Sequence, residues 1–229
     1  MGVFWQTKIG HFLRIVSDGN GIPALRGKCS AVRCSPPSNN KLKITTAKTE
    51  EELLALFRFR YSIYVEEMDR TQHYADHENR LIRDPLDDFA NTLIATDEKL
   101  GIVGTIRTNF LRNGDIGEYI DLYKLDKLSG IELETSSITT RLMILPSYRS
   151  KALAVKLSKA AYTLGLNNGI RSDYIDCNPP LDKFFGRLGH RYIHQCTHPE
   201  YGDVRVMRLD LCDKSYLESI NSPFLDKDH

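Results

Sequence analysis

The pattern of apolar and polar positions along residues 139–164 predicts a strand, a turn and a helix in succession. Leu142 to Leu145 form an unbroken apolar run, short enough for a strand buried on both faces. Pro146 ends the run, and the polar residues 147–150 indicate a turn. The free N–H groups at the start of the following helix favour a bound anion. From Lys151 onward a helical period sets one apolar stripe, made of Leu153, Leu157, Ala160, Ala161 and Leu164.

Further elements are predicted on both sides of this unit. Residues 42–46 alternate as a short strand, and Thr49 is the expected N-cap of a helix whose capping box is closed by Glu52. Residues 93–96 and 102–109 are expected to form a hairpin. The remaining elements expected are a short helix near 122–128, a strand at 174–177, a helix at 181–188 ended by Gly189, and an antiparallel pair at 191–195 and 204–211.

Composition places the chain among soluble globular proteins. Of its 229 residues, 41% are hydrophobic and 27% are charged, and no stretch approaches the ~20 apolar residues of a membrane span. Five cysteines, an odd number at irregular spacing, do not suggest a disulfide framework. They favour a reducing compartment, so we expect a cytoplasmic protein.

The start of the chain is more basic than the rest. Residues 1–49 hold eight Lys or Arg and one acid, which leaves 23 basic and 29 acidic residues on the remainder, a net charge of −6. Residues 3–16 can form a basic amphipathic helix, and residues 18–40 are rich in Gly, Ser, Pro and Asn, as linkers are. We expect this helix to dock on the domain or on a second subunit of a homodimer. Peripheral membrane contact through residues 3–16 and an organelle transit peptide are the alternatives.

The turn and four other motifs carry a resemblance to a known family. The loop Arg149-Ser150-Lys151-Ala152-Leu153-Ala154 resembles the pyrophosphate loop of the GNAT acyltransferases, with alanine at both small positions. The other motifs stand in the order found in one GNAT branch, the acyl-homoserine-lactone synthases and the related N-acyl amino acid synthases. These motifs are Arg-x-x-x-Tyr at Arg60–Tyr64, Asp-x-x-Asp at Asp84–Asp87, Gly-x-x-Arg at Gly104–Arg107, and Arg141 opening the central strand.

The resemblance implies the fold and the domain limits. An α/β (α+β) fold is expected, with three layers in which helices flank a central mixed, mostly antiparallel sheet. The chain would then divide into a basic N-terminal helix and linker at 1–40, a GNAT-like acyltransferase domain at 41–212 and a C-terminal tail at 213–229.

The resemblance also implies transfer of a fatty acyl chain, expected to be long, from acyl carrier protein to the amine of an amino acid. The amine must lose a proton, an oxyanion must be stabilised and a thiolate must leave. Arginine suits the acceptor carboxylate because its planar fork binds both oxygens. The residues expected to hold the acceptor and carry the reaction are Arg60, Asp84, Asp87, Arg107, Glu134 and Arg141. The residues expected to bind the donor are Met143, Ile144, Tyr148, Arg149, Ser150, Lys151, Ala152 and Ala154.

Alternatives remain for the charged set and for the reaction. The charges could instead form an ion-pair network that braces helices against the sheet. The lactone synthases carry Glu at the position of Ile138 and usually Trp at that of Arg70, which favours the amino acid synthases. Phe185 stands where acetyl-CoA enzymes often place a tyrosine acid. A CoA-dependent GNAT acetyltransferase and a non-catalytic module that binds an acyl carrier or acyl-CoA are the other candidates.

No metal and no permanently bound cofactor are expected. His73 and His77 are spaced four apart, as are His190, His194 and His198, but no acid–His helix motif accompanies them. The donor would be acyl-phosphopantetheine on acyl carrier protein, or acyl-CoA. Acyl carrier protein and an amino acid acceptor are the expected partners, and nucleic acid is not.

Overall fold

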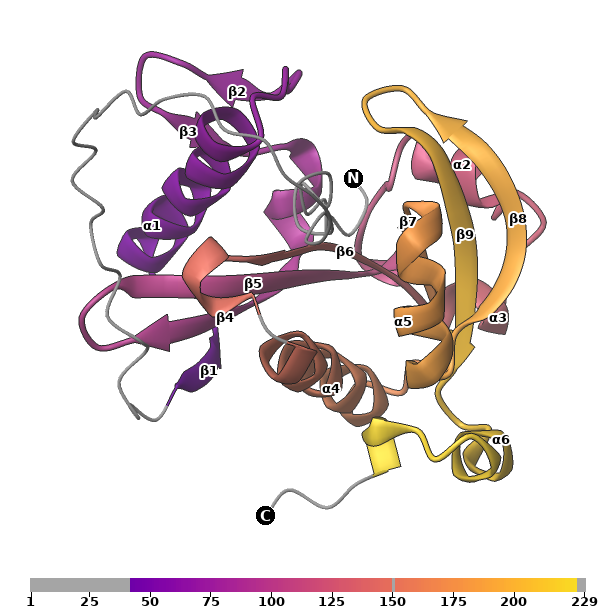
Figure 1. Ribbon diagram of the computed structural model, residues 1–229. Coiled ribbons are helices and arrows are strands. Elements are labelled where there is room, and N and C mark those ends of the chain that lie inside the picture. The colour runs from indigo at the N-terminus through magenta and orange to yellow at the C-terminus, as the bar shows by residue number, and fades with distance from the viewer. Residues whose placement is uncertain (1–41, 150, 226–229) are drawn as a thin grey trace, which may run out of the picture.

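The computed structural model describes residues 42–149 and 151–225 (Figure 1). The predictions for residues 1–40 and for Ser150 lie outside these ranges. Within them, no helix is long and apolar enough to cross a membrane.

A seven-stranded sheet runs through the molecule in the order β1-β4-β5-β6-β7-β9-β8. Neighbouring strands are antiparallel except for β6 and β7, which are parallel. This mixed, mostly antiparallel sheet confirms the predicted fold class. Its strands are β1 (Lys43–Thr46), β4 (Asn91–Asp97), β5 (Gly101–Phe110), β6 (Ser136–Ile144), β7 (Ser172–Cys177), β9 (Gly202–Asp210) and β8 (Arg191–His198).

Helices cover both faces of the sheet and bury a separate core on each (Figure 1). On one face lie α4 (Lys151–Asn167), α5 (Asp182–Leu188), α6 (Lys214–Ser219) and η6 (Pro223–Leu225). On the other lie α1 (Glu50–Tyr61), η1 (Ser62–Glu67) and α2 (Tyr119–Tyr123), with the short elements β2 (Ala75–Asp76), β3 (Leu81–Ile82), η2 (Pro85–Phe89), η3 (Leu111–Asn113) and α3 (Ile131–Glu134). The loop after β6 contains η4 (Pro146–Tyr148), and that after β7 contains η5 (Pro179–Leu181).

The first helix begins and ends as its sequence dictates. Thr49 Oγ1 accepts from the N–H of Glu52, and Glu52 Oε2 accepts from the N–H of Thr49, which confirms the capping box. At its end α1 widens into the π-helical η1, where the N–H of Met68 bonds to the carbonyl of Ile63, five residues back. Such widened turns are frequent at functional sites.

The central strand has two irregularities that matter for the site. Arg107 pairs with Thr140 and Thr105 with Met143, so β6 has two residues opposite Ile106, which is a β-bulge. On the other side, the ladder between β6 and β7 ends at the pair Ile138–Tyr174, although β6 continues to residue 144 and β7 to residue 177. Beyond that pair the two parallel strands separate, and we call this space the strand gap.

Three regions differ from the sequence prediction. Residues 142–144 of the apolar run are the last third of a strand that begins at Ser136, and Leu145 lies just beyond its end. All nine residues of β6 are buried, Ser and Thr included. The short helix expected near residues 122–128 lies at 119–123. Residues 213–225, expected to be a tail, form α6 and η6 and bury Leu217 and Phe224 in the core.

Candidate functional site

Five of the six residues predicted to hold the acceptor meet in one ion-pair network on the α1 face of the sheet. Arg60 Nη1 lies 2.7 Å from Asp87 Oδ2. Arg107 Nη1 lies 2.6 Å from Asp84 Oδ1 and 3.0 Å from Asp87 Oδ1, and its Nε donates to Thr140 Oγ1 at 3.1 Å. Arg141 Nη2 donates to Asp84 Oδ2. We call these five residues the arginine cluster.

The two carboxylates of the arginine cluster are positioned by the turn that they cap. Asp84 Oδ1 accepts from the N–H of Leu86, and Asp87 Oδ2 accepts from the N–H of Asp84. The side chains therefore close a capping box around η2, with Pro85 fixing its first position. The same oxygens then face the arginines, so the Asp-x-x-Asp spacing serves the turn and the ion pairs together.

The bulge in β6 explains how Arg141 reaches this network. Thr140 already faces the α1 side, where it contacts Arg107, so regular alternation would turn Arg141 to the α4 side. Arg141 instead has φ +54°, a left-handed value that is uncommon for a side chain other than glycine. Because of the extra residue, the consecutive side chains of Thr140 and Arg141 both point to the α1 face of the sheet.

The arginine cluster carries more positive charge than its own carboxylates neutralise. Three arginines face two aspartates, and the side chains are at most 3% exposed. Among the described residues, none hydrogen-bonds to five of the guanidinium nitrogens: Nε and Nη2 of Arg60, Nη2 of Arg107, and Nε and Nη1 of Arg141. Buried polar groups are rarely left without partners, so a bound anion is the natural complement.

The pKa values of the arginine cluster reflect its excess of positive charge. Burial, with repulsion from Arg141 and Arg107, lowers the pKa of Arg60 to about 10 although Asp87 opposes the shift. Burial disfavours the charge of Asp87, but Arg60 and Arg107 hold its pKa far below the ordinary value. Burial likewise opposes the ionisation of Asp84, whose pKa is nevertheless lowered by Arg141 and Arg107. Both carboxylates are therefore fully ionised at neutral pH.

Aromatic rings connect the arginine cluster to a surface hollow. The guanidinium of Arg141 lies 5.6 Å from the ring centre of Tyr64, and Tyr64 stacks on Tyr201 with 6.3 Å between centres. Tyr201 in turn lines a hollow of about 650 Å³ between the end of η1 and the β8–β9 turn. The hollow also contains Arg70, whose guanidinium lies 5.4 Å from the Tyr201 ring. A small polar molecule could approach the arginine cluster from this side.

The donor-binding residues lie around the end of β6 and the start of α4. Leu145 N–H donates to the carbonyl of Val103 on β5 at 2.9 Å, so strand alternation turns the N–H of Ile144 away from β5 and toward the strand gap. Met143 lies opposite Thr105 and turns its N–H toward β5. Of these two predicted oxyanion donors, Ile144 has the orientation that faces the gap.

The loop after β6 is tied to neighbouring elements. Both Nη atoms of Arg149 contact the carboxylate of Glu67, each at 2.6 Å, and its Nε donates to the carbonyl of Ile144 at 3.1 Å. Arg149 is thus a brace between the loop and η1, a role that the spacing of the loop did not reveal.

The other predicted donor-binding residues of the loop differ in exposure. The Tyr148 hydroxyl donates to Asp97 at 2.9 Å. The helix α4 begins at Lys151, Ala152 is exposed and Ala154 is fully buried.

Glu134 is the predicted catalytic residue that lies apart. It is exposed at the end of α3, and no described contact joins its carboxylate to the arginine cluster. Its backbone carbonyl accepts from Arg112 Nη1 at 2.9 Å. Ile138, at the position of the lactone synthases' glutamate, is fully buried.

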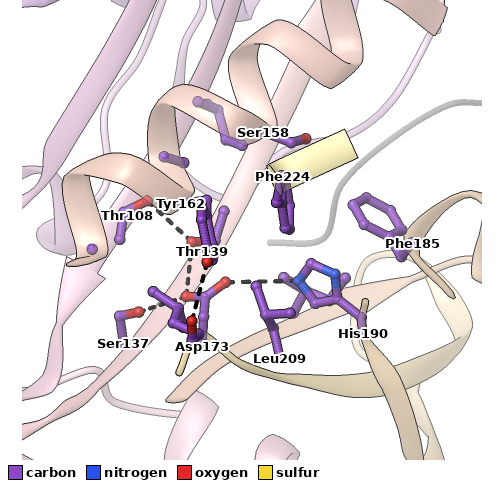
Figure 2. Close-up of a pocket in the computed structure, with 15 residues that line it drawn as sticks. Thr108, Ser137, Thr139, Ser158, Tyr162, Asp173, Phe185, His190, Leu209 and Phe224 are labelled. Atoms are coloured by element: carbon purple, nitrogen blue, oxygen red, sulfur yellow. Dashed lines mark hydrogen bonds and ion pairs between the residues drawn. The ribbon is translucent and has the colours of Figure 1, made fainter. Parts of the chain in front are cut away.

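A small cavity lies on the opposite face of the sheet, under α4 (Figure 2). Its polar side is a chain of hydroxyls: Thr108 contacts Thr139 at 3.0 Å, and Ser137 and Thr139 donate to Asp173 at 2.6 and 2.9 Å. His190 Nε2 lies 3.9 Å from Asp173 Oδ2. The cavity measures about 20 Å³, which is room for about one water. Sequence reasoning missed this group because its members lie far apart in the sequence, on β5, β6, β7 and the residue before β8.

Metal ligands do not gather in the part of the chain that the structure describes, where no three His, Cys, Asp or Glu side chains form such a group. His73 and His77 each contact an aromatic ring, Tyr74 and Tyr61 respectively. His194 contacts the carbonyl of Leu122 at 3.0 Å.

Comparison with known proteins agrees with the sequence motifs. Residues 59–159 match the profile of the acetyltransferase (GNAT) domain. The structure is similar to that of MesI, a CoA-dependent acyl-homoserine lactone synthase, with 20% identity, a TM-score of 0.61 and coverage of 82% of this chain and 97% of that one. It is also similar to BjaI, solved with SAM and isopentyl-CoA, with 17% identity, a TM-score of 0.62 and coverage of 80% and 90%.

A third similar structure is FeeM, an N-acyl amino acid synthase from uncultured soil microbes, with 16% identity, a TM-score of 0.58 and coverage of 79% and 97%. No curated protein sequence matches the chain. At these identities structural likeness establishes the fold. The profile match to residues 59–159 agrees with the GNAT-like fold that the motifs predicted.

Proposed function

We propose that this chain, built on a GNAT acyltransferase domain, is an N-acyltransferase that moves an acyl group from phosphopantetheine to the amine of an amino acid. The observation that carries the proposal is the uncompensated charge of the arginine cluster. A carboxylate bound there would neutralise the third arginine and accept from guanidinium nitrogens that now have no described partner. An α-amino acid supplies that carboxylate and places its amine one carbon away.

The strand gap is where donor and acceptor would meet. The N–H of Ile144 faces the gap and could stabilise the oxyanion that forms when the amine attacks the thioester carbonyl. The start of α4 would hold the phosphates, because the N-terminus of a helix carries the positive end of the helix dipole. Free CoA and an acyl carrier protein present the same phosphopantetheine to this loop.

The acyl chain would extend into the cavity under α4. Its lining is mostly apolar, and Thr139 and Ile175 lie just beyond the last paired residues of β6 and β7, so the cavity adjoins the strand gap. At about 20 Å³ the cavity takes a long chain only if lining side chains move. This small volume also favours a second candidate, transfer of an acetyl group from CoA.

A product assay tests the proposal. The purified protein is incubated with acyl-CoA or acyl carrier protein carrying chains of two to sixteen carbons, together with the amino acids and S-adenosylmethionine, and products are identified by mass spectrometry. N-acyl amino acids support the proposal, whereas acyl-homoserine lactones would make the chain a lactone synthase. Donor binding without any product would make it a non-catalytic module.

A variant in the cavity separates long-chain from acetyl transfer. Ser158 lies on α4, is 6% exposed, and its Oγ has no hydrogen-bond partner among the described residues (Figure 2). Ser158→Leu fills the cavity, so transfer of long chains should fall while transfer of acetyl groups persists. Equal rates of long-chain transfer by the wild-type protein and by Ser158→Leu would show that the acyl chain binds elsewhere.

A further inference from the structure

The strand gap contains a buried acid that the arginine cluster does not use. Asp176 lies on β7 two residues beyond Tyr174, the last residue paired with β6. If the pairing of Ile138 with Tyr174 is continued by two residues along both strands, Asp176 lies opposite Thr140. Thr140 contacts Arg107 and is followed by Arg141. Its side chain faces the α1 and α2 side, as the contact with Tyr123 shows. Asp176 and the arginine cluster therefore share one face of the sheet and border the same gap.

The carboxylate of Asp176 is only half satisfied. Its side chain is fully buried, and Oδ1 accepts the hydroxyl of Tyr123 from α2. Oδ2 has no hydrogen-bond partner among the described residues. A buried carboxylate oxygen without a hydrogen-bond donor is energetically costly. A role in binding or catalysis would account for an aspartate at this position.

The surroundings of Asp176 favour its protonated form. Burial raises the pKa of Asp176, and among the described residues outside β7 the titratable groups facing it are the hydroxyl of Tyr123 and the thiol of Cys196 from β8. Burial raises the pKa of both these neighbours, so they are neutral and add no charge at neutral pH. A carboxylate whose pKa is raised accepts a proton more readily than an ordinary aspartate.

Other candidates for proton transfer on this face are occupied. Asp84 and Asp87 are locked into ion pairs and have lowered pKa values, so they are poor bases. Burial lowers the pKa of His198 to about 3, and its Nδ1 accepts from the N–H of Glu200. Asp173 is three residues from Asp176 and faces the cavity on the opposite side.

We propose that Asp176 is the general base that takes the proton from the ammonium group of the acceptor. The assignment rests on the proposed function. The ammonium N–H breaks and its proton passes to Oδ2, the neutral amine adds to the thioester carbonyl, and a C–N bond forms. Collapse of the oxyanion then breaks the C–S bond. The second N–H proton goes to the departing thiolate, giving an amide and a thiol, and Asp176 returns its proton to solvent.

The test compares two acceptors that differ in whether they need a base. An ordinary amino acid is an ammonium ion at neutral pH, whereas aminooxyacetate has a carboxylate and an amine that is already neutral. Asp176→Asn keeps the acceptor for the Tyr123 hydroxyl but cannot take a proton. It should slow transfer to the amino acid by about 10²–10⁴-fold. Transfer to aminooxyacetate should fall less than about tenfold, and the deficit with the amino acid should shrink as pH rises.

Controls separate this role from a structural one. Asp121→Asn makes the same change at an exposed position of α2 and should leave both rates unchanged. Equal losses with both acceptors in Asp176→Asn would overturn the assignment. If the wild-type protein transfers to neither acceptor, the proposed function fails and the role of Asp176 with it.

A second variant covers the case in which Asp176→Asn does not fold. Tyr123→Phe removes the hydroxyl that stabilises the carboxylate, so the pKa of Asp176 should rise further. The acid limb of the pH–rate profile should then move to higher pH while the plateau is kept. An acid limb that stays in place would also overturn the assignment.

Discussion

Arg141 contacts Asp84 because β6 carries one more residue than β5 between the paired positions on either side of the bulge. The guanidinium uses only Nη2 for this contact, which leaves Nε and Nη1 available to a ligand. Each of these two nitrogens can donate a charge-assisted hydrogen bond to an anion. Arg141 is therefore the arginine that we expect to hold the acceptor.

The first prediction follows from these two nitrogens of Arg141. Arg141→Lys keeps the positive charge near Asp84 but loses the two free nitrogens. We expect KM for the amino acid to rise at least about tenfold, since a charge-assisted hydrogen bond contributes about 1.5–3 kcal/mol. Arg83→Lys is the matched control, because Arg83 and Asp88 form an exposed pair. A fall in melting temperature with KM unchanged would assign Arg141 to bracing alone.

The second prediction concerns acid stability. Asp84 and Asp87 have folded pKa values below the unfolded value near 3.8, so their ionised forms favour the folded state. That stability is complete above the unfolded pKa and is lost as pH falls below it. In urea titrations between pH 6 and pH 2, Asp87→Asn should show a shallower loss of unfolding free energy than wild type. At neutral pH it should be less stable by about 3–5 kcal/mol. Parallel pH curves would contradict the ion pairs.

The third prediction separates two roles of Arg149. Arg149→Glu places two carboxylates together and should weaken donor binding. In the double variant Arg149→Glu with Glu67→Arg, the brace between the loop and η1 is restored with reversed polarity. If Arg149 acts only as a brace, calorimetry should find donor affinity recovered. Persistent weakening would mean that Arg149 also contacts the donor phosphates.

Prediction from sequence succeeded where local chemistry decides the structure. The capping box at Thr49 and Glu52 was readable because it closes within four residues. The first two thirds of β6 were missed because Ser, Thr and Arg side chains there are buried by partners far away in sequence, such as Asp84 and Asp173. Asp176 was missed for the same reason, since its partner Tyr123 lies 53 residues earlier.

The fourth prediction concerns an acyl carrier protein as donor. An apolar groove of about 810 Å³ runs between α4 and α5, and Lys183 and Arg187 stand exposed along its rim, four residues apart. Carrier proteins are acidic, so Lys183→Glu with Arg187→Glu should slow transfer from the carrier protein at least about tenfold at low salt, and less at high salt. Transfer from acyl-CoA should be unaffected.

The control for this pair is Lys124→Glu with Lys127→Glu, which changes the net charge equally at exposed positions beside α2. If both pairs slow the reaction alike, the effect is one of overall charge. If neither does, the groove is not the docking surface.

The central claim is that the arginine cluster binds the carboxylate of the acceptor, and paired acceptors test it most directly. Each amino acid that serves as a substrate is compared with the amine that lacks only its carboxylate, for instance tyrosine with tyramine or leucine with isoamylamine. Removing the carboxylate would leave the third arginine uncompensated, so kcat/KM should fall at least about 100-fold. Equal kcat/KM for an amino acid and its decarboxylated partner would contradict the account.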